Sequence, residues 1–131
     1  MKIVRYCGKE RLPGGTRLWR RLARLVGFKG TLELYGYGIG GKPGRAQLHA
    51  YLHGERSAVT IGDYGKNQIR VWVRCSCSPV DSAEQYEPEP LHVFAHELGH
   101  YIQDLRHKTY KTKAIDEAVA ERYGRWLRSK L

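Results

Sequence analysis

Long apolar runs are missing from this sequence, and cysteines are few. No hydrophobic stretch approaches the roughly 18 consecutive apolar residues typical of a membrane-spanning helix. The segment Met1–Tyr6 has no signal-peptide core, so we expect a cytoplasmic protein. Three cysteines, an odd number, argue against a disulfide framework in that compartment.

Acidic residues are outnumbered in this chain. There are 13 Asp and Glu against 23 Lys and Arg, which gives a formal net charge of +10. Such a balance favours partners that carry negative charge. The length of 131 residues fits one domain, 1–131, with one modest core, and leaves no room for a second catalytic module.

A phosphate-binding loop is missing as well. The glycines of segment 36–44 alternate with other residues, but no Lys-Ser or Lys-Thr follows them and no strand-to-helix setting surrounds them. We interpret this segment as a flexible hairpin connection. It is a candidate rim for an active site elsewhere in the chain.

One motif does point to chemistry: His96-Glu97-Leu98-Gly99-His100. Two histidines four residues apart lie on the same face of a helix, where they can share a metal ion. Catalytic zinc sites hold three protein ligands and keep the fourth position open for water. We therefore predict that His96 and His100 bind Zn²⁺ and that Glu97 is the catalytic general base.

The surrounding residues support a helix at this motif. Apolar residues recur at helical spacing from about Pro90 to Leu105, which predicts a largely buried helix. Gly99 costs this helix about 1 kcal/mol relative to alanine. A small residue there indicates close packing against a following helix or a strand on the substrate side.

A second helix is expected to supply the third ligand. It begins near Ala114 and extends to about Leu127, and it carries Glu117 and Glu121 one turn apart on one face. We predict Glu117 as the metal ligand and Glu121 as the acceptor for the free N–H of a metal-bound imidazole. The reverse assignment stays open, as does an ordinary solvated or Arg-paired role for Glu121.

These two segments resemble the gluzincin metallopeptidases. The matching residues are His96–Gln103 and Asp116–Glu121, in the last third of the chain. The short length is most similar to the minimal single-domain minigluzincins, and the pattern also resembles the protease-like domain of the ImmA/IrrE group. The resemblance implies a zinc-dependent peptidase. Larger gluzincins use a His or Tyr from a separate subdomain that is missing here; the candidates in this chain are Tyr101, Tyr110 and Tyr123.

Other interpretations of the motif and of the cysteines stay open. The two histidines could be satisfied by hydrogen bonds without a metal. Alternatively, the zinc could be structural, with its fourth coordination position filled by Cys77, His92 or His107. Cys75 and Cys77 could bind a second metal. One of them could also occupy the open zinc position and keep the enzyme latent, or both could be simple buried or loop thiols.

Between the N-terminal third and the motif, the pattern changes to that of strands. Alternation of apolar and polar residues predicts a small antiparallel or mixed sheet packed on the metal helix. In the clearest strand, Ile69, Val71 and Val73 form a buried face, and Arg70 and Trp72 a solvated one. Turns are expected at Gly54 and at 63–65. The predicted strands are 31–35, 46–53, 58–61 and 68–74.

The N-terminal segment Thr16–Val26 predicts an amphipathic helix with Thr16 as N-cap and Gly27 as its end. Its polar face is almost entirely arginine. Such a face fits nucleic acid, an anionic membrane or an acidic protein, or it is simply solvated. Trp19 and Trp72 are candidates for base stacking, although no nucleic-acid-binding motif is present.

Together these features predict an α+β, minimal zincin-like domain. It consists of an N-terminal helix, a sheet of three or four strands, the HExxH helix and a C-terminal glutamate helix. The expected function is zinc-dependent hydrolysis of peptide bonds in a peptide or protein substrate. The alternative is a catalytically silent regulator on the same scaffold, which binds nucleic acid through its basic N-terminal helix.

Overall fold

The computed structural model describes residues 1–6, 12, 14–39, 62–65, 67–73, 75 and 90–131. Within these residues the protein has three helices and four strands, which confirms the α+β fold. In chain order the elements are β1 (Lys2–Arg5), α1 (Gly15–Val26), β2 (Thr31–Gly36), β3 (Gly62–Gly65), β4 (Gln68–Val73), α3 (Pro90–Leu105) and α4 (Lys113–Arg128). The predicted strands 46–53 and 58–61, the turn at Gly54, Cys77 and most of the glycine-rich segment lie outside the described residues.

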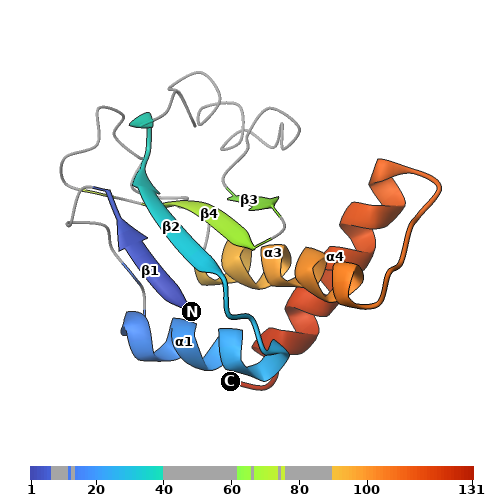
Figure 1. Cartoon of the computed structure of the whole chain (residues 1–131), viewed down its shortest axis with the longest axis horizontal. Coiled ribbons are helices and arrows are strands. Elements are labelled where there is room, and N and C mark those ends of the chain that lie inside the picture. The colour runs from blue at the N-terminus through green and yellow to red at the C-terminus, as the bar shows by residue number, and fades with distance from the viewer. Residues whose placement is uncertain (7–11, 13, 40–61, 66, 74, 76–89) are drawn as a thin grey trace.

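The strands form one mixed sheet in the order β1-β2-β4-β3. Strand β2 pairs in parallel with β1 and β4, whereas β3 pairs antiparallel to β4. The three helices gather on one face of this sheet, and β3 lies at its edge beside α3 (Figure 1). This arrangement places the edge strand next to the helix that carries the HExxH motif.

The core lies between the sheet and the helices. The alternation in β2 and β4 turns one set of apolar side chains toward α1 and α3, as expected for a sheet with one face against helices. These side chains are fully buried, so the hydrophobic effect holds the two layers together. The cluster contains Leu32, Leu34, Ile69, Val71 and Val73 from the sheet, Trp19 and Leu22 from α1, Leu91, Phe94 and Leu98 from α3, and Leu127 from α4.

Helices α3 and α4 meet at two glycines. A Cβ atom on Gly99 would lie 2.2 Å from the backbone oxygen of Ala120, and one on Gly124 would lie 3.0 Å from the backbone nitrogen of His96. The predicted close packing at Gly99 is therefore confirmed, and its neighbour is the following helix. Because neither glycine has a side chain, the two backbones approach closely enough for short side chains to meet across the interface.

The ends of α4 and α1 show how local sequence sets the helix bounds. Thr112 caps α4, since its side-chain oxygen accepts a hydrogen bond from the backbone N–H of Ile115 at 3.2 Å. Gly27 ends α1 in a left-handed conformation, as predicted. The predicted N-cap of α1 was wrong: the cap position is Gly14, and Thr16 lies inside the helix.

Two further predictions about the sheet were wrong. Residues 63–65, expected to be a turn, belong to strand β3, because pairing with β4 overrides the turn tendency of Asp and Gly. Trp72, expected on a solvated face, is 4% exposed. Its ring stacks on Tyr35 with centroids 5.2 Å apart, and its Nε1–H donates to the backbone oxygen of Ile39. Strand β1 was not predicted at all.

None of the helices in the described part of the chain has the length and apolar character needed to cross a membrane.

The contact at Gly99 leads to a stability prediction. We expect Gly99→Ala to lower the free energy of unfolding by about 1–3 kcal/mol, because the added methyl group collides with backbone that cannot rotate away. This loss has to exceed the gain of about 1 kcal/mol that alanine brings to a helix interior. Urea unfolding followed by circular dichroism measures the difference.

The matched control is Gly65→Ala. A Cβ atom there has its nearest neighbour, the backbone oxygen of Gln68, at 3.9 Å, an ordinary contact. This variant should therefore unfold close to the wild-type urea concentration. Equal midpoints for the two variants would contradict close packing at Gly99.

Candidate metal centre

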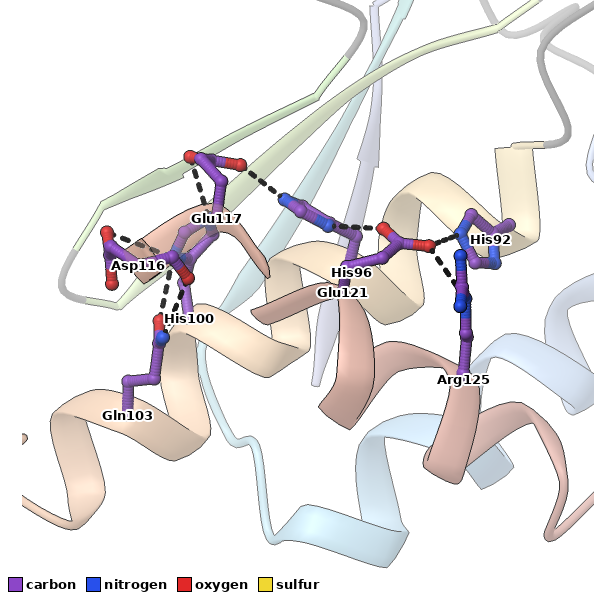
Figure 2. Close-up of polar contacts among 8 residues, drawn as sticks. All are labelled: His92, His96, His100, Gln103, Asp116, Glu117, Glu121 and Arg125. Carbon is purple, nitrogen blue, oxygen red and sulfur yellow. Dashed lines mark hydrogen bonds and ion pairs between the residues drawn. The ribbon is translucent and has the colours of Figure 1, made fainter. Parts of the chain in front are cut away.

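The two histidines of the motif and one acid of α4 come together as a group. His96, His100 and Glu117 each offer one ligand atom, and these three atoms lie within 4.8 Å of one another. Oxygens of Glu117 lie 2.8 Å from Nε2 of His96 and 3.2 Å from Nε2 of His100. The three residues can therefore hold a metal ion, with the carboxylate facing both imidazoles (Figure 2).

The other nitrogen of each imidazole has its own partner. Nδ1 of His96 lies 2.7 Å from Oε2 of Glu121, and Nδ1 of His100 lies 2.9 Å from Oε1 of Gln103. An N–H that donates from Nδ1 leaves the lone pair on Nε2, which is the form a metal ligand requires. Both rings are thus oriented with Nε2 toward Glu117.

The structure separates the two glutamates of α4. Glu117 lies next to the Nε2 atoms of both histidines, whereas Glu121 lies next to Nδ1 of His96 and to His92 (Figure 2). Glu117 therefore belongs to the group that could hold a metal ion, and Glu121 lies within hydrogen-bond distance of the other nitrogen of His96. Burial acts to raise the pKa of Glu121, but hydrogen bonds to His96 and His92 outweigh it, and the pKa is lowered.

Glu97, the predicted general base, is 7% exposed. Strand β3 covers it closely, since a Cβ atom on Gly62 would lie 2.9 Å from Oε1 of Glu97. Burial, opposed by the charge of His96, raises the pKa of Glu97 to about 8. A buried carboxyl group with a pKa near neutrality is suited to accept and return a proton.

Electrostatics also mark His96 as unusual. Burial acts to lower the pKa of this residue, but the surrounding carboxylates, Glu121 foremost, outweigh burial and raise the pKa above 6.5. Within the described part of the chain, Glu117 forms ion pairs with the two histidines and with no lysine or arginine. A cation bound between them would balance that negative charge.

Two residues at the site, Gln103 and Tyr64, were not given a role from the sequence, and His92 was considered there only as a ligand of a structural zinc. Gln103, 3% exposed, bonds Nδ1 of His100 and donates to the backbone oxygen of Asp116. Its spacing of three from His100 on one helix was the signal that could have identified it. Tyr64 lies parallel to the ring of His100 with centroids 6.2 Å apart, and His92 contacts Glu121.

The remaining candidate residues lie elsewhere. Tyr101 donates to the backbone oxygen of Gly27 at the end of α1, and the hydroxyl of Tyr123 accepts from Arg106. Tyr110 lies in the connection between α3 and α4. Within the described residues, His92 and His107 are not part of the metal-ligand group. Cys75 is buried, and Cys77 is outside the described residues.

The two glutamates give a prediction about metal binding. We expect Glu117→Gln to weaken zinc binding more than Glu121→Gln, because only Glu117 faces both Nε2 atoms. Glu121→Gln keeps an amide oxygen that can accept from His96 but loses the carboxylate charge, so it should weaken binding about 10-fold, the lower end of the range for residues that orient a ligand. Competition with a chromophoric chelator measures both. A stronger effect of Glu121→Gln would reverse the assignment.

Comparisons with protein-family models, with curated proteins and with solved structures each found no match.

Proposed function

We propose that the protein is a zinc-dependent metallopeptidase. The observation that carries this proposal is the set of two imidazole nitrogens and one carboxylate oxygen within 4.8 Å, together with the buried Glu97, which is close enough for its charge to act on His96. Two histidines and one acid are a donor set typical of catalytic zinc, in which a fourth position stays open for water and substrate. On this proposal the chain belongs with the gluzincins that its motif resembles.

The residues have separate tasks. Zinc, when bound, supplies the Lewis acidity that polarises a peptide carbonyl and activates a water molecule. Glu97 accepts a proton from that water as its oxygen bonds to the carbonyl carbon. The same carboxyl group then gives the proton to the amide nitrogen, so that the C–N bond breaks and a neutral amine leaves.

The protein environment prepares Glu97 for this task. Its burial under β3 keeps bulk water away and raises its pKa in the metal-free protein. A cation bound at the neighbouring histidines would oppose this shift and favour the ionised carboxylate that a general base requires. Glu121 and Gln103 hold the two imidazoles with Nε2 turned inward. Rotation of the rings away from the shared position is thereby hindered.

The experiment that tests this function compares wild type with Glu97→Gln. Both proteins should bind one equivalent of zinc, because Glu97 is not among the three predicted ligands. Cleavage of an unstructured protein such as casein should fall about 10²–10⁴-fold in the variant, as expected for loss of a general base. Unchanged cleavage with zinc still bound would rule out this mechanism.

A second candidate function follows from helix α1. Its four arginines Arg17, Arg20, Arg21 and Arg24 are all exposed, while its apolar side faces the core. We propose as the alternative a zincin-scaffold regulator that binds nucleic acid phosphates through this face. Base stacking by Trp19 or Trp72 is not part of it, because both rings are buried.

This alternative predicts salt-dependent binding of DNA. Fluorescence anisotropy with a labelled duplex and a labelled single strand should show binding at low salt that weakens as salt rises. Replacing Arg17, Arg21 and Arg24 by glutamine should reduce both the affinity and the salt dependence. If neither DNA probe binds at low salt, the nucleic-acid-binding function is excluded.

A further inference from the structure

Glu121 uses both of its carboxylate oxygens. Oε2 accepts from Nδ1 of His96 at 2.7 Å, and Oε1 contacts Nε2 of His92. Figure 2 shows the resulting line of contacts, in which Glu121 of α4 lies between His92 and His96 of α3. His92 lies one turn before His96 on the same helix, so the three residues form a bridge between the two helices.

The orientation of a carboxylate depends on what holds its second oxygen. With only His96 as partner, the group can rotate about its side-chain bonds and present either oxygen or neither. Arg125 gives little restraint, since its Nε is 3.6 Å from Oε1 and its side chain is 75% exposed. His92 is 32% exposed, and its ring has fewer rotatable bonds than an arginine.

We propose that His92 is a positioning residue for the metal centre, acting through Glu121; this inference rests on the metal site of the proposed function. By donating from Nε2 to Oε1, His92 fixes Glu121 with Oε2 toward Nδ1 of His96. That contact keeps the N–H of His96 at Nδ1 and directs its Nε2 toward Glu117.

The same contact reinforces the difference between the two glutamates that the packing of α4 on α3 sets up. A glutamate whose oxygens are both engaged by imidazole N–H groups is held away from the ligand position, even though it lies one turn from Glu117 on the same face of α4. His92 thereby leaves the ligand position to Glu117. Position 92 therefore requires a side chain that places an N–H donor where Nε2 of His92 lies.

Two substitutions separate this role from simple packing. His92→Leu removes the donor while it keeps an apolar side chain of similar reach. His92→Gln retains an N–H donor, because the side-chain amide nitrogen of glutamine can take the place of Nε2. The matched control is His107→Asn, a histidine beyond the end of α3 with a φ of 52°, a conformation that asparagine tolerates.

The test is zinc titration of the full-length chain by chelator competition. His92→Leu should weaken zinc binding about 10-fold, the lower end of the range for residues that orient a ligand. His92→Gln and the control should bind as the wild type does. Thermal unfolding without metal checks that each variant is folded, and a His92→Gln protein that binds as weakly as His92→Leu would overturn the proposal.

A double-mutant cycle tests whether the effect passes through Glu121. In a Glu121→Ala background, which removes both contacts, His92→Leu should cause no further loss of zinc affinity; a full additional loss would overturn the proposal. Failure of the role proposed for His92 and failure of the proposed peptidase function give different results. If the wild type binds zinc but cleaves no peptide, only the proposed peptidase activity is contradicted. If His92→Leu binds zinc as tightly as the wild type, only the positioning role of His92 is contradicted. A wild-type chain that binds no zinc contradicts both.

Discussion

The close approach of α3 and α4 is the constraint on which the rest of the site depends. At Gly99 and Gly124 each helix meets the backbone of the other. Glutamate side chains from α4 are short, and they reach imidazoles on α3 only because the helix axes lie close together. A larger residue at either glycine would separate the helices and increase the distances from Glu117 to both histidines. The packing of α3 on α4 therefore also sets the geometry of the candidate metal centre.

Strands β3 and β4 also shape the candidate site. Strand β4 provides the apolar surface on which α3 packs, and β3 extends that surface over Glu97. Because β3 is short and rich in glycine, its backbone comes close to the carboxyl group and excludes water from it. Burial, to which β3 contributes, is the main cause of the raised pKa of Glu97.

Much of the site was predictable because its determinants are local. Four-residue spacing places His96 and His100 on one face, and the same rule pairs Glu117 with Glu121. The sequence favoured Glu117 as ligand and Glu121 as acceptor but left the reverse open, because the choice depends on how α4 is rotated against α3. Alternation in β4 correctly indicated two different faces but not what covers each, so the burial of Trp72 by Tyr35 was missed. Strand β3 was missed because its pairing is a tertiary effect.

The connection between α3 and α4 has a consequence for folding. His96 and Glu117 are 21 residues apart in the chain, so the ligand set comes from one helical hairpin and its closure costs little conformational entropy. By contrast, β2 reaches β4 across 37 residues, from Thr31 to Gln68. The hairpin can therefore assemble before the parallel strands pair, in keeping with the faster formation of local contacts.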